Sequence, residues 1–431
     1  MRYDYLVIGS GSSGGMVAAR LSEDPSISVL LLEAGGREGH WTIRMPAATR
    51  NNFLGGPRNW CFSTEPEPWM DNRRIFQPRG KVIGGSSSLN GMVFVRGHRE
   101  DFNRWEAAGA EGWSYEDVLP HFRTMETCLR GGDAYRGDTG PISVSRMSDL
   151  HPMEQAFLEA VDQAGYGMAH DYNGADQDGG TAFDVNIAHG ERSATAALIG
   201  RIRNRPNLTV LTGAHVTRLL IEGGRVTGAA FIRNGTEQEA RCDAEVILSA
   251  GAVQSPQILM LSGIGPAGQL RSHGITVRHD LPGVGENLHD HLEVHIKHRS
   301  AAGTSRNGLL KPHHMAAIGL QWFLSRTGPR RDNAQPGRRF PSHRKGRPVS
   351  GHPVSFLALL PRRLVAAARQ GRLLLRCRTG ADGKPRLGKA GKCRPAGGAD
   401  HAAERTARGD RPQGLPGQHQ DHPRDRGAAR L

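Results

Sequence analysis

The chain has 431 residues, which is long enough for two domains and a sizeable core. Its formal net charge of +14 suggests a nucleic-acid partner, but residues 326–431 carry 25 Lys and Arg against 7 Asp and Glu, a net of +18, so the first 325 residues carry −4. That balance argues against a nucleic-acid surface in the first three quarters, and five cysteines without C-x-x-C spacing argue against a zinc site or a disulfide framework.

The first predicted elements form a βαβ unit. The pattern predicts strand, helix and strand at residues 5–8, 16–21 and 29–32. A G-x-G-x-x-G motif follows the first strand: Gly9 allows the tight turn, Gly11 lets backbone N–H groups approach a pyrophosphate, and Gly14 lets helix and strand pack closely. Glu33 ends the second strand, where it can accept hydrogen bonds from ribose hydroxyls, and the helix N-terminus favours phosphate. The unit predicts a dinucleotide site and leaves FAD and NAD as alternatives.

Three later segments bear on the choice of cofactor. Residues 79–93 combine paired glycines, serines and apolar residues, so the main chain can lie close to a flat, bulky partner. Residues 246–265 indicate a buried strand, a glycine and a helix that opens near Pro256; this is either a second backbone surface for a ligand or an ordinary connection. Residues 281–293 gather two histidines and three acids, where a metal site is the weaker alternative because no further ligand is evident.

The composition changes after Ser325. Residues 326–431 contain no Ile, Met, Tyr or Trp, while Arg, Gly, Pro and Ala dominate. Such a segment has little apolar surface to offset the entropy of ordering it, so we expect disorder or poorly packed helix from residue 330 onwards. A basic tail that binds nucleic acid or anionic lipid is one explanation, and off-frame translation of a GC-rich gene is the other. The second is favoured because the basic residues show no helical stripe and no aromatic interleaving.

Gly80–Asn90, Gly251–Gly265 and several shorter stretches together resemble one known family. The shorter stretches are residues 59–68, 95–105, 112–115 and 135–137. The family is that of the glucose–methanol–choline (GMC) oxidoreductases: Gly80–Asn90 is similar to its first signature and Gly251–Gly265 to its second. The resemblance extends to about residue 325 and is greatest to the choline dehydrogenases of the family.

The resemblance implies an FAD-dependent enzyme that oxidises the CH–OH group of an alcohol, choline to betaine aldehyde, by hydride transfer to flavin N5. It implies that the ADP half of FAD is bound by Gly9, Gly11, Ser12, Ser13, Gly14, Glu33 and Val216, and that the flavin ring is flanked by Val82, Gly85, Asn90, Gly91, Met92 and Val93. Relatives with covalent flavin have a histidine where this chain has Leu89, so non-covalent FAD is expected. Glu293 matches an acid that faces the trimethylammonium group of choline; a rim carboxylate is the alternative reading.

The family pattern stops near Pro329, before the C-terminal histidine that takes the alcohol proton in relatives. We therefore assign no catalytic base and no metal ligand, and a truncated or frameshifted C-terminus is the expectation. An inactive FAD-binding remnant is one alternative function. A flavoprotein with a basic tail that docks on lipid or nucleic acid is another.

The expected fold is α/β, with a Rossmann-like FAD-binding domain and a second, incomplete α+β substrate domain whose sheet is largely missing. The FAD-binding domain is assigned to residues 1–150 and 195–295, the substrate domain to 151–194 and 296–329, and the Arg/Gly/Pro-rich tail to 330–431. The apolar run at residues 5–8 is too short for a signal peptide or a membrane span, so a cytoplasmic protein is expected. The sequence does not identify the electron acceptor. A quinone acceptor is one alternative, and it would require peripheral contact of the protein with the inner membrane. A nucleic-acid partner is not expected.

Overall fold

The computed structural model describes residues 1–37, 39–288, 290, 292–299, 306–327, 338–340, 354–357 and 372–379. The chain divides into two compact units, Met1–Arg394 and Pro395–Leu431, and every described residue belongs to the first. The two histidines of segment 281–293, His289 and His291, lie outside the described residues, as does most of the tail from residue 330.

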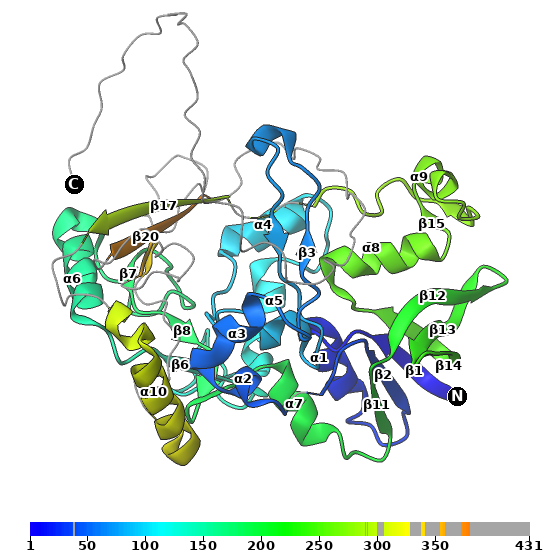
Figure 1. The fold of residues 1–431 in the computed structure, drawn as a ribbon, viewed down its shortest axis with the longest axis horizontal. Coiled ribbons are helices and arrows are strands. Elements are labelled where there is room, and N and C mark those ends of the chain that lie inside the picture. Colours follow the sequence, from blue (N-terminus) through cyan, green and yellow to red (C-terminus); the bar gives the residue numbers. More distant parts are fainter. Residues whose placement is uncertain are drawn as a thin grey trace, which may run out of the picture. The chain divides into compact units, whose positions relative to one another are not determined.

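A six-stranded sheet combines the beginning of the chain with residues 208–248 (Figure 1). Its order is β11-β2-β1-β14-β13-β12, with bounds Arg2–Ile8 (β1), Val29–Glu33 (β2), Leu208–Thr212 (β11), His215–Glu222 (β12), Arg225–Arg233 (β13) and Thr236–Leu248 (β14). β11, β2, β1 and β14 are parallel neighbours, whereas β12, β13 and β14 form an antiparallel meander. All of β2 and the last three residues of β1 are buried. Their apolar runs therefore suit a parallel sheet that is covered on both faces.

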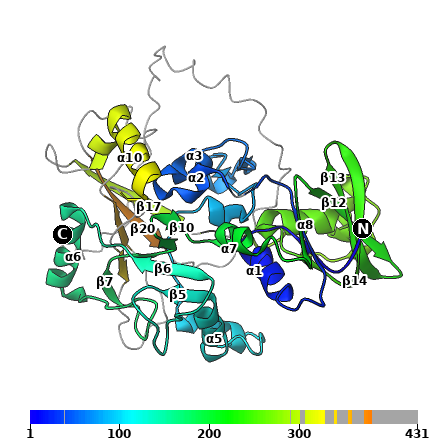
Figure 2. The ribbon, with the colours of Figure 1, turned by 90° about the horizontal axis from the view of Figure 1, so that it is seen from below.

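Helices cover both faces of this sheet. α1 (Ser12–Leu21) and α7 (Thr195–Ile202) lie side by side, and Ile199 of α7 shares a buried core with residues of α1, β1 and β2 (Figure 2). α8 (Gly251–Leu261) contributes Ile258 to the core on the other face. The strand-turn-helix connections thus bring both predicted turns, after β1 and after β14, to the same edge of the sheet, since these strands are parallel neighbours.

α8 begins earlier than the sequence indicated. We expected it to open near Pro256, but its first residue is Gly251, whose φ is +86°, and Pro256 lies inside the helix. The N-cap residue Ala250 provides no side-chain hydrogen bond, so the usual capping preferences gave the wrong boundary. A glycine with positive φ allows the chain to turn directly from β14 into the helix.

Shorter elements fill the segment between β2 and α7. The helices are α2 (Trp41–Arg44), α3 (Thr49–Phe53), α4 (Arg99–Ala107), α5 (Tyr115–Met125) and α6 (Pro152–Val161), with further single turns at Pro46–Ala48, Pro68–Met70, Gly85–Ser88 and Asp162–Tyr166. α4, α5 and α6 each begin with a capping box, which fixes where they start. A three-stranded sheet contains β5 (Glu126–Cys128), β6 (Ile142–Arg146) and β8 (Asp184–Val185). The remaining short elements are β3 (Phe62–Ser63), β4 (Phe76–Gln77), β9 (Ile187–Ala188), β10 (Glu191–Arg192), β15 (Ile264–Gly265), α9 (Ala267–Ser272) and β16 (His279–Asp280).

A five-stranded sheet runs in the order β17-β20-β19-β18-β7. Its strands are β7 (Gly179–Thr181), β17 (Leu292–Arg299), β18 (Arg338–Phe340), β19 (Val354–Leu357) and β20 (Arg372–Thr379), and all four pairings are antiparallel. The expectation of disorder or helix after residue 330, with a largely missing sheet, is therefore wrong for these three late strands. Composition averaged over the whole tail hid the short apolar runs that β19 and β20 contain.

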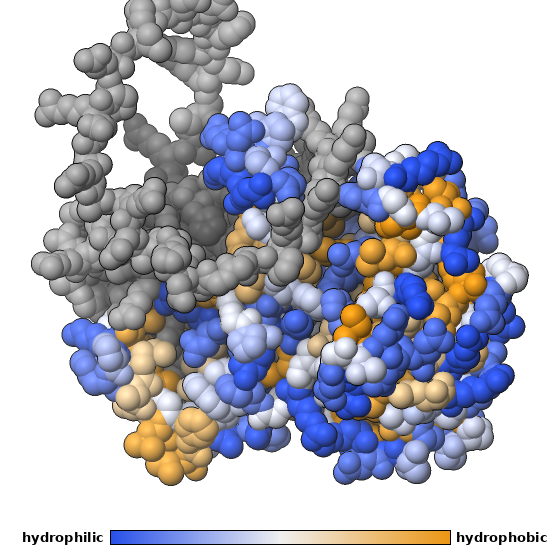
Figure 3. Space-filling model, turned by 45° about the vertical axis from the view of Figure 1, so that its right-hand side comes forward, coloured by the Kyte–Doolittle hydropathy of each residue, from blue (hydrophilic) through white to orange (hydrophobic). Residues whose placement is uncertain are grey.

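α10 (Pro312–Ser325) packs on one side only. It buries Ile318 and Trp322 in a cluster with residues of the α2–α3 segment. Its exposed large apolar side chains are Met315, Leu320, Phe323 and Leu324. Figure 3 shows apolar surface at the lower edge of the molecule, where α10 ends. In the part of the chain that the structure describes, no helix has both the length and the apolar character needed to cross a membrane.

Candidate dinucleotide site

The turn between β1 and α1 requires two of its motif glycines for reasons internal to the protein. Gly9 has a φ of +93°, and a Cβ at this position would lie 2.5 Å from the carbonyl oxygen of Ser249. A Cβ at Gly14 would lie 2.0 Å from the carbonyl oxygen of Gly9. Since neither oxygen can move without displacing backbone, both glycines are needed for the tight turn and for the packing of α1 against the strands.

Gly11 differs from these two glycines. Its φ of −62° and ψ of −166° suit any amino acid, and a Cβ added there would meet nothing within 4 Å. Among the described residues, no contact explains why this position is glycine. The open space beside its backbone is what a pyrophosphate needs to approach the main chain closely.

The N-terminus of α1 lies next to this space and carries partial positive charge. Gly11 is the N-cap and provides no side-chain hydrogen bond, and the first turn contains no acidic residue. Ser12 and Ser13, which follow, are exposed. Because the first N–H groups of a helix need acceptors and the helix dipole favours anions there, this end of α1 is suited to bind phosphate.

Glu33 lies at the end of β2 and is only 6% exposed. One carboxylate oxygen accepts hydrogen bonds from the backbone N–H (3.1 Å) and the hydroxyl (2.5 Å) of Ser10, and the other from the backbone N–H of Gly35 (2.8 Å). Burial raises the pKa of Glu33, and the bonds from Ser10 and Gly35 offset that effect only in part. Since a carboxylate can accept about four hydrogen bonds, Glu33 retains capacity for a ribose hydroxyl.

The raised pKa of Glu33 predicts a pH dependence of stability. A carboxyl group whose folded pKa lies above its unfolded value stabilises the fold at low pH, and this contribution is lost as the pH rises through the folded pKa. As the pH falls from 8 to 5, we therefore expect the cofactor-free wild type to become more stable relative to Glu33→Gln. At pH 7, we expect Glu33→Gln to bind FAD about tenfold more weakly than wild type. Thermal melts across this range and FAD titrations measure both effects. A stability difference that moves in the opposite direction would contradict the burial argument.

The second glycine-rich segment lies against the first. A Cβ at Gly85, whose φ is +51°, would lie 2.9 Å from the Cα of Gly11, so two segments far apart in sequence meet backbone to backbone. Val82 is fully buried in a cluster with Ile43 and Leu89, and its carbonyl accepts a hydrogen bond from the backbone N–H of Gly85 (2.7 Å). The two segments together form one continuous main-chain surface.

The residues predicted to flank a flavin continue from this surface. Asn90 is exposed, and its side-chain oxygen accepts hydrogen bonds from the backbone N–H of Met92 (3.1 Å) and from Arg192 (2.7 Å). Met92 is fully buried with a φ of +61°, a conformation that non-glycine residues rarely adopt, and Gly91 is half-buried. Val93 forms a β-bridge with β8. The segment is thus held in one defined conformation.

Two further predicted residues lie in strands. Val216, in β12, is 6% exposed and packs in the core with Leu6 and Phe231, a role that needs no ligand. Glu293 lies in β17, where its backbone is paired with that of Arg378. The adenine contact of Val216 and the substrate contact of Glu293 stay predictions.

Arg192 was missed in the sequence. It is 5% exposed and hydrogen-bonds both the side chain and the backbone carbonyl of Asn90. An arginine normally indicates a solvent-exposed cation, so nothing in the sequence around position 192 signals its burial. The two halves of this contact are a hundred residues apart along the chain, which single-sequence reasoning cannot connect.

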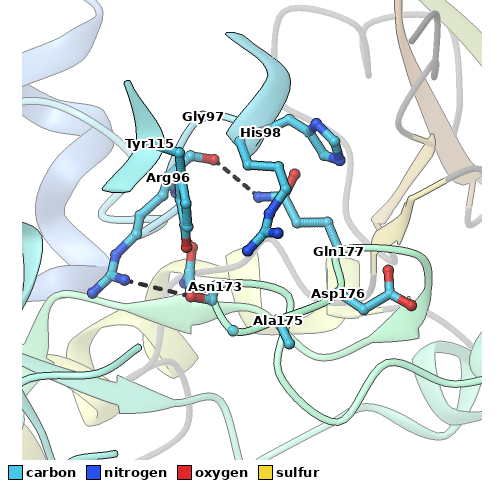
Figure 4. A pocket seen from close by; sticks show the side chains of 10 residues that line it. Arg96, Gly97, His98, Tyr115, Asn173, Ala175, Asp176 and Gln177 are labelled. Carbon is cyan, nitrogen blue, oxygen red and sulfur yellow. Dashed lines mark hydrogen bonds between the residues drawn. The ribbon is translucent and has the colours of Figure 1, made fainter. Parts of the chain in front are cut away.

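A polar pocket lies beside the same segment but away from the two glycine turns. Its lining residues include Arg96, His98, Tyr115, Asn173 and Gln177 (Figure 4). The Gln177 side chain donates to the backbone carbonyl of Arg96 (3.2 Å), as the figure shows. None of the residues predicted to bind cofactor or substrate lines this pocket, so it is not the candidate cofactor site.

The parallel sheet, the open glycine and the uncapped helix define a dinucleotide-binding α/β protein. A family model described as GMC oxidoreductase matches residues 3–293, and the chain belongs to this family of FAD-binding flavoproteins. The chain is 43% identical over 376 residues to the mitochondrial choline dehydrogenase of Mus musculus, covering 85% of this chain and 63% of that protein. It is 46% identical over 329 residues to the oxygen-dependent choline dehydrogenase of Rhizobium etli, covering 76% of this chain and 60% of that protein. The chain thus spans about three fifths of the length of these relatives.

Solved structures show the same fold. A formate oxidase variant from Aspergillus oryzae RIB40 superposes with a TM-score of 0.78 at 26% identity, covering 88% of this chain and 72% of that chain. Pyridoxine 4-oxidase from Mesorbium loti gives a TM-score of 0.76 at 30% identity, covering 91% of this chain and 76% of that chain. The α/β fold class with a Rossmann-like FAD-binding domain, predicted from the sequence, is confirmed.

Proposed function

We propose that this chain binds FAD without a covalent link and uses it to oxidise the CH–OH group of an alcohol, with choline as the substrate. The observation that carries the proposal is Gly11, a glycine that the fold itself does not require, at the uncapped end of α1. Membership of the GMC family supports FAD over NAD, and 43–46% identity to choline dehydrogenases supports choline.

The residues present fit FAD. The pyrophosphate would lie against the open backbone at Gly11 and the first turn of α1, with Ser12 and Ser13 beside it. Glu33 would accept from a ribose hydroxyl, and the backbone at Val216 would meet adenine. The flavin ring would lie along the main-chain surface formed by Val82, Gly85, Asn90, Gly91, Met92 and Val93. When bound, FAD supplies the acceptor for the hydride that leaves the carbinol carbon.

The protein's own residues have binding and orienting roles in this proposal. Glu293 would face the trimethylammonium group of choline, because a carboxylate is the physical partner of a permanent cation that cannot donate hydrogen bonds. Leu89, which precedes Asn90, is buried and cannot form a covalent bond to flavin. No residue is proposed as the base that accepts the hydroxyl proton.

The proposal is tested by anaerobic titration of the FAD-loaded chain with choline. We expect the visible flavin absorbance to bleach, and we expect Glu293→Gln to weaken the response to choline by at least about tenfold while a neutral primary alcohol is affected less. FAD-loaded chain that choline does not bleach would overturn the oxidation of choline while leaving FAD binding in place. Chain that folds but binds no FAD would overturn both.

A further inference from the structure

All five N–H donors of Arg192 are used, and all of them bond to neutral oxygens. The acceptors are the carbonyl of Ile43 (3.1 Å), the carbonyl of Ser87 (2.9 Å), the side chain (2.7 Å) and carbonyl (3.1 Å) of Asn90, and the hydroxyl of Thr49 (2.8 Å). A guanidinium has five donors in a fixed planar arrangement, so this site is built around the whole group. Arg192 therefore joins the α2–α3 segment to the segment that carries Asn90.

The positive charge of Arg192 has no counter-ion among the described residues. Its neighbour Glu191 instead pairs with Arg44 (2.6 Å) and Arg326 (2.8 Å) on the outer side. Burial alone lowers the pKa of Arg192 to about 9. A buried charge without a partner is costly, and a carboxylate in place of either side-chain acceptor, Thr49 or Asn90, would have relieved that cost.

The other two deeply buried arginines among the described residues, Arg96 and Arg136, are treated differently, because both pair with the carboxylate of Glu126. Arg136 is 1% exposed and pairs with Glu126 (2.5 Å), Asp171 (2.7 Å) and Asp184 (2.8 Å). The same fold thus supplies carboxylates where an arginine serves packing alone. Arg192, the buried arginine without a carboxylate partner, is the one that contacts Ser87 and Asn90, on the backbone surface assigned to flavin.

We propose that Arg192 is a positioning residue of the flavin site that also stabilises negative charge on the flavin ring. This inference rests on the proposed function. Taking up a hydride adds two electrons and one proton to the flavin, so the ring gains one unit of negative charge, while the alcohol that supplied the hydride becomes the carbonyl product. A buried, uncompensated cation acting through Asn90 favours that charged form. A hydrogen bond that only holds two segments together would not favour the reduced, negatively charged flavin over the oxidised form.

The test compares Arg192→Gln and Arg192→Lys with Arg44→Gln in the FAD-loaded full chain. Arg44→Gln removes the same charge from a half-exposed position in the neighbouring pair with Glu191. The measurements are the FAD dissociation constant, the melting temperature and the equilibrium between oxidised and reduced flavin against a reference dye. We expect Arg192→Gln to shift that equilibrium at least tenfold toward oxidised flavin, equivalent to about 30 mV for a two-electron couple. Arg192→Lys keeps the charge and is expected to restore most of the shift, and Arg44→Gln to leave it unchanged.

Each possible result of this comparison either supports or contradicts the proposed role of Arg192. Arg192→Gln that binds FAD with an unchanged equilibrium, even if it melts earlier, would reduce Arg192 to a structural cross-link. Should Arg192→Gln fail to fold, Arg192→Lys decides: an equilibrium like that of wild type supports the charge argument, and a shift as large as tenfold overturns it. Wild-type chain that binds no FAD would instead overturn the proposed function, and this inference with it.

Discussion

Gly11→Asp is expected to weaken FAD binding at least about hundredfold while leaving the cofactor-free chain as stable as wild type or slightly more stable. The backbone at Gly11 suits any residue, and a Cβ there meets nothing within 4 Å, so the fold accepts the substitution. Aspartate is a preferred N-cap residue, and its charge complements the helix dipole, each worth a few tenths of a kcal/mol or more. The same carboxylate would occupy the space assigned to the pyrophosphate and repel it.

Two further variants separate the causes in the Gly11 prediction. Gly11→Asn introduces a side chain of the same shape as aspartate but without its charge. The difference in FAD affinity between Gly11→Asp and Gly11→Asn therefore measures charge repulsion. The difference between Gly11→Asn and wild type measures the loss of space for the pyrophosphate. Gly14→Ala is the structural contrast, because its Cβ would lie 2.0 Å from the carbonyl oxygen of Gly9 and should lower the melting temperature of the cofactor-free chain. FAD titrations and thermal melts of the three variants check both parts. Tight FAD binding by Gly11→Asp would remove Gly11 from the cofactor site.

Glu126→Gln is expected to destabilise the chain by about 3–5 kcal/mol. Glu126 is fully buried and pairs with two arginines, Arg136 at 2.5 Å and Arg96 on its other oxygen. Removing its charge leaves those buried guanidinium groups with one carboxylate fewer. The matched control is Glu65→Gln, which breaks an exposed pair with Arg74 and should cost less than about 1 kcal/mol.

We expect Glu126→Gln also to weaken FAD binding, because the buried charge cluster supports the segment proposed to flank the flavin. Arg96 lies four residues after Met92 in this segment. Between them, the backbone N–H of Phe94 donates to the carbonyl of Asp184 (2.8 Å), whose side chain belongs to the same charge cluster. Chemical denaturation of both variants, followed by FAD titration, measures stability and cofactor affinity separately. Equal costs for Glu126→Gln and Glu65→Gln would show that the buried cluster is not a special source of stability.

The sequence predicted the βαβ unit well because its signals are local. Apolar runs, turn glycines and Glu33 all lie within about thirty residues, and each has a single physical role. The start of α8 was misplaced because its entry depends on a glycine with positive φ rather than on a capping side chain. β18, β19 and β20 were missed because a strand can form wherever a partner edge exists, whatever the surrounding composition.

The sequence could not predict contacts that join distant segments. The burial of Arg192 depends on Ile43, Thr49, Ser87 and Asn90 coming together, and no periodic pattern encodes that meeting. The charge cluster around Glu126 is similar: its acids and arginines look like ordinary surface residues until the fold brings them together. Pattern-based reading assigns charged residues to the surface, which is the right default and fails at these sites.

The measurement closest to the central claim is the absorbance spectrum of folded, cofactor-free chain after incubation with excess FAD and removal of the unbound fraction. We predict about one FAD retained per chain, with resolved flavin bands, and release of the flavin on denaturation because no covalent link holds it. Protein that is cooperatively folded in a thermal melt but remains colourless would contradict the account, since the backbone surface around Gly11 would then have no dinucleotide to bind.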